Sequence, residues 1–545
     1  ELLHFSMLAA STIGPGTVIV CSKSGADYGL RLIWTLVLAS WIAYTLQEGA
    51  ARLCIVSHVS FGQAMRMHFG SSEALTNVPL VCSVVAIGIL IGNAAYEANN
   101  FVGALEAVYA LTLPQTVAAR VLMSFVFGVL CVVTLLSGKV DHISQPLGLV
   151  VVLMVVLFGI SAMMIGVDGE DFGIGLVPYI PPGASVIALS MVATTAIPFN
   201  SFLASSAAEG RDVASMRRGI GFSCLMAGIL SVLIVITGTD LDDDDSDFTV
   251  GDVPSALKKR QGAFAGFAFG VGLLAAAFSS ALTVAVGAAI TVQSLMSTPP
   301  SAPPPSSRPA LSSASSSTDF DLQDVEPKGT PHAPLDGEAE EKGDKSTEMV
   351  TVKPVEPVSP PYASSSSPLP SQGQESKKSV FPESLRFWKR QPEEFKVHGT
   401  WSRRGWRFRG IIIGLAMLSF AVGASGMPTV SVVLTAQVVN GILLPCIAVC
   451  LVLCLNDARL MRSRPMTVGE NVQVVLVSAA TLFLAANTII GAAVSSELIK
   501  MTCSAGAMIV LITPLVMHVV KAQSQLKHYA AAEQRTITSE ATDAA

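Results

Sequence analysis

Two short breaks interrupt apolar segments of this chain and constrain its fold more than any other feature. Gly14-Pro15-Gly16-Thr17 lies in the first apolar segment, and Ile197-Pro198-Phe199-Asn200 lies in the sixth. Glycine and proline release backbone amides and carbonyls from the helical hydrogen-bond pattern, and each unsatisfied group costs several kcal/mol in hydrocarbon. Such breaks persist at membrane depth only where protein or a wet cavity satisfies the backbone. Matching breaks in two halves of a membrane chain therefore predict a transporter with its substrate site at the breaks.

Apolar runs long enough to cross a bilayer recur along the chain. Hydrophobic residues make up 51% of the 545 residues, and charged residues only 14%. A run of about 20 apolar residues spans a hydrocarbon core of about 30 Å. We therefore predict an all-α polytopic membrane protein with about twelve spanning helices, at roughly 3–22, 30–50, 78–111, 118–137, 145–166, 184–207, 218–238, 263–294, 410–427, 430–455, 471–492 and 500–520.

Charged residues in the loops predict the orientation of the chain. Basic residues follow every even-numbered segment, at Arg52 and Arg66, Lys139, Arg211, Arg217 and Arg218, Arg459, Arg462 and Arg464, and Lys521 and Lys527. Acidic residues gather in the loops on the other side, at 168–171 and 242–245. The positive-inside rule then places both termini in the cytoplasm. At the cytoplasmic end of the second segment, we expect Glu48 to pair with Arg52 rather than to contact a substrate.

The segment 297–400 differs in composition from the rest of the chain. Residues 297–317 are almost entirely Ser, Pro and Ala, and the charged stretch that follows has no sustained apolar period. Such a segment cannot bury enough apolar surface to offset the entropy of ordering, so we expect a disordered cytoplasmic linker, open to cytoplasmic partners. It separates spanning helices 1–8, in 1–296, from helices 9–12, in 401–522, and a cytoplasmic tail follows at 523–545.

The overall composition argues against several classes of protein. The net charge of −6 disfavours nucleic acid as a partner. The nine cysteines fall almost entirely in predicted helices and indicate buried apolar residues rather than a disulfide framework. The sequence has no Gly-x-x-x-x-Gly-Lys-Ser/Thr nucleotide-binding loop and no recognisable catalytic constellation. We therefore expect neither an enzyme nor a cofactor.

Several motifs resemble those of the NRAMP family of metal transporters, in the family's order. The matching runs are Gly14-Pro15-Gly16-Thr17, Leu46-Gln47-Glu48-Gly49-Ala50-Ala51-Arg52-Leu53, Thr194-Thr195-Ala196-Ile197-Pro198-Phe199-Asn200, Gly272-Leu273-Leu274-Ala275-Ala276 and Ala436-Gln437-Val438-Val439. The resemblance covers about 1–295 and 405–520. It implies a five-plus-five inverted repeat, the leucine-transporter-like fold, in which helices 1 and 6 are broken. It also implies inward movement of divalent metal ions, typically manganese or iron(II), with protons and by alternating access.

The family's metal ligands, however, are replaced at the matching positions. The resemblance implies ligands from Asp-Pro-Gly-Asn in helix 1, where this chain has Gly14 and Thr17, and from a methionine in helix 6, where it has Ile197. The two helix 6 histidines of the family correspond to Phe199 and Ala204. The resemblance thus implies a substrate site at Ser11, Gly14, Thr17, Thr194, Ile197, Asn200 and Gln437, in which Asn200 and Gln437 are the remaining side-chain ligands. A divalent ion loses tens of kcal/mol of hydration energy when it enters a low-dielectric site. These neutral ligands can replace only part of that energy, so we expect them to bind a dehydrated transition metal poorly.

One carboxyl group in the third segment is placed to supply charge. Asn93, Glu97 and Asn100 follow one another at spacings of four and three residues, so the three side chains share one face of a helix. An ionisable group in the middle of an apolar segment is expensive and usually functional. We expect Glu97, with Asn93 and Asn100, to handle protons or cations. The alternative is a protonated carboxyl group that holds helices together.

Three functional hypotheses follow. The first is a secondary transporter of the NRAMP type that carries divalent metal ions across the bilayer, with coupling to protons. The second keeps transport but changes the substrate to a hydrated magnesium-like ion or a small neutral solute, because the carboxylate and thioether ligands are missing. The third is a non-transporting receptor or scaffold that signals through the cytoplasmic linker.

Overall fold

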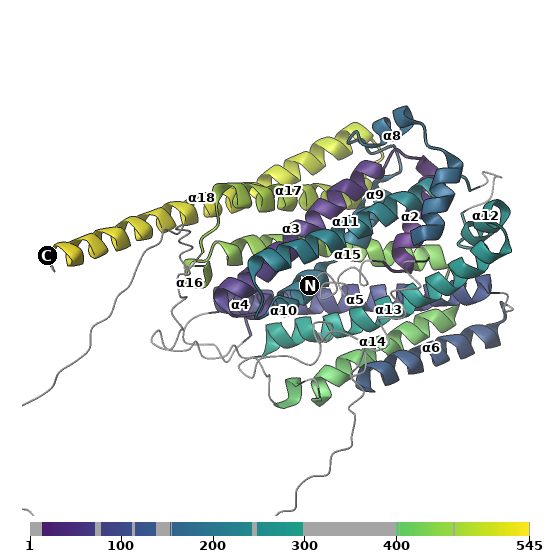
Figure 1. Ribbon diagram of the computed structural model, residues 1–545, viewed down its shortest axis with the longest axis horizontal. Coiled ribbons are helices and arrows are strands. Elements are labelled where there is room, and N and C mark those ends of the chain that lie inside the picture. Colours follow the sequence, from purple (N-terminus) through teal and green to yellow (C-terminus); the bar gives the residue numbers. More distant parts are fainter. Residues whose placement is uncertain are drawn as a thin grey trace, which may run out of the picture. The chain divides into compact units, whose positions relative to one another are not determined.

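The computed structural model describes residues 13–70, 78–111, 115–137, 153, 155–241, 248–297, 399–402, 404–461 and 464–543, with side chains as far as 525. Over these residues the chain consists of helices joined by turns and short connections (Figure 1). Most of the predicted linker, 298–398, lies outside the described residues, so its disorder stays a prediction.

The helices follow one another in a simple order along the chain. Their bounds are α2 Pro15–Tyr28, α3 Ile33–Ser57, α4 Phe61–Phe69, α5 Leu80–Ala110, α6 Val117–Ser137, an unlabelled helix Val155–Ile165, α8 Gly169–Gly175, α9 Ser185–Thr195, α10 Pro198–Ala207, α11 Val213–Gly238, α12 Asp252–Gln261, α13 Ala263–Met296, a 3-10 turn Gly399–Trp401, α14 Trp406–Ser425, α15 Thr429–Leu455, α16 Ala458–Met461, α17 Val468–Gly491 and α18 Glu497–Asp543.

A helix occupies the described part of every segment that the sequence predicts to span the membrane. Within the described residues, nine helices are long and apolar enough to cross a bilayer, with α9 and α10 taken together. The other predicted spans contain α2, α3 and the helix Val155–Ile165, so the total of twelve stays a prediction. The last helix, α18, continues to Asp543 through the region that the sequence assigns to a tail.

The centre of the bundle is formed by α9, α10 and α13. In their most apolar stretches 94% of the residues of α9–α10 and 89% of those of α13 are buried, against 17% in α18. α13 packs along α5, α15 packs against α5 and α9, and α2 packs against α5, α9 and α11 (Figure 1). The two broken segments therefore lie where side chains are removed from both lipid and water.

A network of ion pairs connects α3, α11 and α17. The Arg52 side chain is 2% exposed, and its guanidinium lies 3.2 Å from Glu48 Oε2 and 2.6 Å from Glu470 Oε1. Arg217 reaches the same two carboxylates, at 2.8 Å from Glu48 Oε1 and 3.0 Å from Glu470 Oε1. The predicted pairing of Glu48 with Arg52 is confirmed, and it belongs to a network of four residues on three helices.

Candidate functional site

The predicted break in helix 6 is confirmed, and Pro198 fixes where it ends. Ala196 (φ −94°, ψ 72°) and Ile197 (φ −82°, ψ 129°) are non-helical, and α10 begins at Pro198. Proline suits this position because it has no N–H to satisfy and its fixed φ matches the first turn of a helix. Thr194 is fully buried, and its hydroxyl donates to the Met191 carbonyl at 2.8 Å, in the last turn of α9.

The break in helix 1 is described from Ile13 onward. Gly14 is extended (φ −122°, ψ 178°), and α2 begins at Pro15. The Thr17 side chain, in the first turn of α2, is 2% exposed. Ser11 lies outside the described residues, so a role for its carbonyl stays a prediction.

Gly14 and Gly16 bring the start of α2 into close contact with three other helices. A Cβ atom on Gly16 would lie 2.3 Å from Gln437 Nε2 on α15 and 2.7 Å from Asn99 Nδ2 on α5. A Cβ atom on Gly14 would lie 3.0 Å from Ser280 Oγ on α13 and 3.6 Å from Asn100 Oδ1 on α5. Ordinary Cβ contacts begin at about 3.4 Å, so the approach at Gly16 requires a residue without a side chain.

These contacts gather a set of buried polar side chains that we call the amide cluster: Tyr96, Asn99, Asn100, Ser280 and Gln437. All five are fully buried, and Tyr96 adjoins Gln437. Among the described residues, no hydrogen-bond partner is found for Ser280 Oγ, Asn100 Oδ1 or either amide atom of Asn99, and the Tyr96 hydroxyl and the Gln437 amide have only each other. Nearly all buried polar groups in proteins have partners, so water, an ion or a polar solute is needed to complete the cluster.

The sequence predicted two members of this cluster, Gln437 and Asn100, and missed the other three. Ser280 belongs to a helix that resembles the family's eighth, but nothing in its spacing indicates that it faces Gly14. Asn99 lies next to Asn100 in α5, on another face than Asn93, Glu97 and Asn100, and the sequence analysis does not single it out. The approach of α2 to that face is the signal that identifies it, and this approach is visible only in three dimensions.

Glu97 adjoins the amide cluster through Asn100. Its side chain is 1% exposed and accepts a hydrogen bond from Asn100 Nδ2 at 3.3 Å. No Lys, Arg or His of the described residues forms an ion pair with it. Asn93, on the same predicted face, donates instead to the Val284 carbonyl of α13 at 3.4 Å. The structure therefore connects Glu97 with Asn100 but gives Asn93 a partner on another helix.

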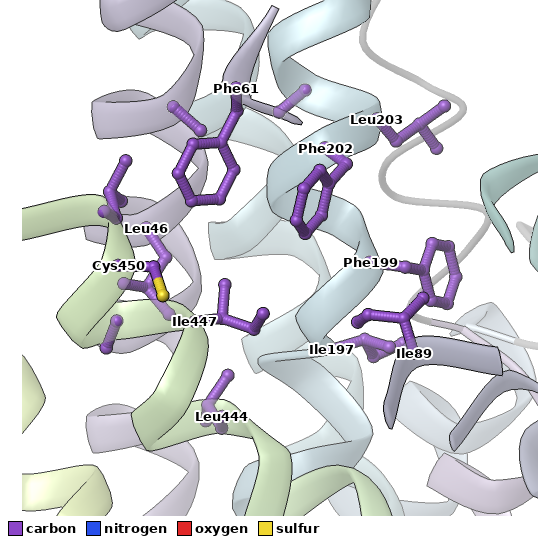
Figure 2. Close-up of a cluster of buried hydrophobic side chains, with 14 of the residues drawn as sticks. Leu46, Phe61, Ile89, Ile197, Phe199, Phe202, Leu203, Leu444, Ile447 and Cys450 are labelled. Carbon is purple, nitrogen blue, oxygen red and sulfur yellow. The ribbon is translucent and has the colours of Figure 1, made fainter. Parts of the chain in front are cut away.

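The helix 6 positions that the resemblance matches to the family's methionine and histidines lie in an apolar cluster (Figure 2). Ile197 is 2% exposed and Phe199 is fully buried, and both pack in the same cluster as Ile89 of α5. The Phe199 ring lies against Gly287 of α13, where a Cβ atom would be 2.4 Å from the ring. The side chains of Ile197 and Phe199 have no oxygen, nitrogen or sulfur atom that could bind an ion. In the break of helix 6, an ion could instead be bound by backbone carbonyls and by the Asn200 side chain.

Asn200 is fully buried in the first turn of α10, and its backbone N–H donates to the Ile197 carbonyl at 3.1 Å. The structure thus places Asn200 on the far side of the helix 6 break and Gln437 beside the start of α2. Over the described residues, no group of three or more His, Cys, Asp or Glu side chains could hold a metal ion. The groups available to bind an ion at this site are therefore mainly neutral amides, hydroxyls and backbone carbonyls.

The sequence and the fold were compared with known proteins. The profile of the "Natural resistance-associated macrophage protein-like" family matches residues 6–312 and 393–523. The chain is 27% identical to "Divalent metal cation transporter MntH" of Lacticaseibacillus casei over 303 residues, which cover 51% of this chain and 64% of the relative. It is 23% identical to the MntH protein of Mycobacterium tuberculosis over 309 residues, 53% of this chain and 68% of the relative. The match thus spans about two thirds of the length of these relatives.

Among solved structures, the fold is similar to that of the Eremococcus coleocola manganese transporter, in a crystal structure of a point mutant. The TM-score is 0.52 at 16% sequence identity, and the match covers 97% of this chain and 95% of that chain. The predicted all-α polytopic fold with broken helices 1 and 6 is confirmed by this likeness and by the break at 196–197. Because the family profile matches most of the sequence, the chain belongs to the natural resistance-associated macrophage protein (NRAMP) family.

Proposed function

We propose that the chain is a secondary transporter that carries a divalent metal ion across a membrane by alternating access. Its relatives named divalent metal cation transporters support this class of substrate. The observation that carries the proposal is the amide cluster, a set of buried polar groups at the start of α2, where a broken helix, α5, α13 and α15 meet. Ligand sites of transporters with broken helices lie at such junctions, near the middle of the bilayer.

The ion is proposed to keep much of its water in this site. Neutral amide and hydroxyl oxygens suit hard cations, and magnesium gives up its hydration shell reluctantly. No thioether, thiolate or imidazole lies in the amide cluster to favour a softer transition metal. Asn99 and Gln437 present donors as well as acceptors, which can bind water molecules around an ion rather than the ion alone.

Glu97 is proposed to handle the protons that accompany the ion. It is the carboxyl group bonded to the amide cluster, through Asn100, and it has no cationic partner among the described residues. Such a group can change protonation when a cation arrives or leaves nearby. Glu106, in the same helix, is a natural comparison because Thr429 Oγ1 donates to it at 2.6 Å, away from the cluster.

Flux into proteoliposomes tests the proposal. We expect uptake of manganese or magnesium above a no-metal control, and loss of that uptake in Gln437→Leu. Gln473→Leu is the matched control, because Gln473 lies on α17 and donates to Thr45 Oγ1 at 3.0 Å, outside the cluster. Glu97→Gln should abolish proton movement coupled to metal, whereas Glu106→Gln should preserve it. No flux of any metal from folded protein would refute the metal-transporter proposal.

A small neutral solute is the second candidate substrate, because the unpaired atoms of the cluster include both donors and acceptors. Thermal stabilisation by sugars, amides or amino acids, lost in Gln437→Leu, would favour it over a metal ion.

We further propose that both termini are cytoplasmic, as the basic loops predict. A receptor that signals through 297–400 is tested by deleting this segment, because intact transport after the deletion would contradict it.

A further inference from the structure

A groove on the lipid-facing side of the bundle lies between α5, α13 and α14. Its volume is about 730 Å³, and it is open toward the surroundings of the bundle. α14 packs against both α5 and α13, and these three helices are neighbours in Figure 1. Apart from its polar end, the walls are aliphatic and include Leu90, Ile91, Val292, Ile411, Leu415 and Leu418.

Two glycines lower the wall of the groove on the side of α14. Gly410 and Gly414 lie one turn apart and line it, and a Cβ atom on either would meet nothing within 4 Å. Elsewhere in the bundle, many glycines permit the close approach of another helix, as Gly16 does. Gly410 and Gly414 instead leave open space, so an acyl chain could lie where side chains would otherwise project.

One end of the groove carries an arginine between two tryptophans. The Arg407 guanidinium lies 5.3 Å from the ring centre of Trp401 and 5.4 Å from that of Trp406. The Trp401 carbonyl accepts a hydrogen bond from Gln293 Nε2 of α13 at 2.7 Å, which fixes this end of the groove to the bundle. Arg407 is exposed and pairs with no carboxylate among the described residues.

The position of this end along the membrane follows from the proposed orientation. α14 begins at Trp406 and enters the membrane from the cytoplasmic side, so Arg407 and its two tryptophans lie at the inner interface. Tryptophan rings prefer the headgroup level, and the inner leaflet is rich in anionic lipids. The aliphatic walls then extend from this interface into the hydrocarbon region.

The geometry points to a binding site for one anionic phospholipid, with an acyl chain over Gly410 and Gly414 and the phosphate on Arg407. An arginine binds a phosphate through two parallel N–H donors, which a neutral interface residue cannot do. The site is distinct from the amide cluster, so it holds whether the transported substrate is an ion or a neutral solute. The charge of Arg407 favours an anionic headgroup, and the open space over Gly410 and Gly414 accommodates an acyl chain rather than another helix.

Native mass spectrometry of the full chain, with added phosphatidylglycerol or phosphatidylcholine, tests this site. Wild-type protein should retain one phosphatidylglycerol at least about fivefold better than phosphatidylcholine. Arg407→Gln should remove this preference, and Arg404→Gln should keep it, because Arg404 is an exposed arginine that does not line the groove. Gly414→Leu should lose the bound lipid of either kind, since its side chain enters open space and fills the groove.

Three results would overturn the proposal. The first is equal retention of the two lipids by wild-type protein. The second is an identical preference in Arg407→Gln and Arg404→Gln. The third is a dimer that Gly414→Leu dissociates, which would show that a second copy of the chain occupies the groove. Melting curves of each variant in detergent establish that a lost lipid does not reflect lost folding.

Discussion

Gly16→Ala is the substitution that most directly tests the amide cluster. The added methyl group would lie 2.3 Å from Gln437 Nε2 and 2.7 Å from Asn99 Nδ2, and both contacts must lengthen to about 3.4 Å. The Gln437 amide must therefore move by about 1 Å. Such overpacking costs about 1–3 kcal/mol. Alanine returns about 1 kcal/mol through its higher helix propensity, so we expect a net destabilisation of about 0–2 kcal/mol.

The functional effect should be much larger than this change in stability. Asn99 has no hydrogen-bond partner among the described residues and Gln437 has only Tyr96, so both amides can rotate away without unfolding the protein. A displacement of about 1 Å in a binding constellation can cost on the order of a hundredfold in rate. Transport by Gly16→Ala should therefore fall about 10- to 100-fold, while the melting temperature in detergent falls by a few degrees at most.

The assay is flux per folded molecule in proteoliposomes, with thermal unfolding in detergent measured on the same preparations. Gly221→Ala in α11 is the matched control, because its Cβ atom would make an ordinary contact of 3.6 Å with the Tyr44 ring. Flux equal to wild type in folded Gly16→Ala protein would show that the substrate does not pass between these amides. It would refute the assignment of the site.

Three further perturbations test the packing and the charges around the site. Phe199→Ala should destabilise the protein by about 3–5 kcal/mol, because the ring is fully buried, and thermal unfolding in detergent measures the loss. Arg52→Met should cost about 1.5–3 kcal/mol, because Glu48 and Glu470 lose one of the two arginines that they share and keep only Arg217; an unchanged melting temperature would contradict this. Burial raises the pKa of Asp457, but hydrogen bonds from His68 and Arg459 outweigh burial and hold it below the ordinary value. The ionised Asp457 therefore stabilises the fold above its unfolded pKa of about 3.9, and this stabilisation is lost as pH falls below that value. The test compares Asp457→Asn with its parent in a His68→Gln background, so that His68 itself does not titrate. The loss of stability caused by Asp457→Asn should persist from pH 7 to pH 5 and shrink below about pH 4.

The helices could be predicted from the sequence because their physical causes are local. Pro198 favours the start of a helix, since it lacks an N–H and its ring clashes with a preceding turn, although Pro445 and Pro514 are accommodated inside α15 and α18. The pairing of Glu48 with Arg52 is equally local, because residues four apart meet on one face of a helix. In both cases a local pattern in the sequence is enough to predict the feature.

The candidate site could be predicted only in part, because its residues meet across helices. The period of α5 places Asn99 and Asn100 on adjacent faces but does not say which face meets α2. In the sequence Gly16 is evident only as a helix breaker. Its second role is to leave room for the Gln437 and Asn99 side chains, and this role depends on how α2, α5 and α15 cross. Ile197 stands where the resembling family has a metal-ligating methionine, but in the structure its side chain packs among apolar residues.

The neutrality of the amide cluster has an electrical consequence. None of its five side chains bears a charge to cancel that of a cation, so a divalent ion held there carries both charges through the membrane field. Each charge is worth about 2.3 kcal/mol per 100 mV, so the field supplies about 4.6 kcal/mol for the ion at that voltage. At about 1.4 kcal/mol per tenfold, this corresponds to a concentration ratio above a thousandfold. Because the five side chains of the empty site are neutral, the voltage acts on the step that moves the loaded site and not on its return, whereas a carboxylate ligand would divide the same driving force between these two steps.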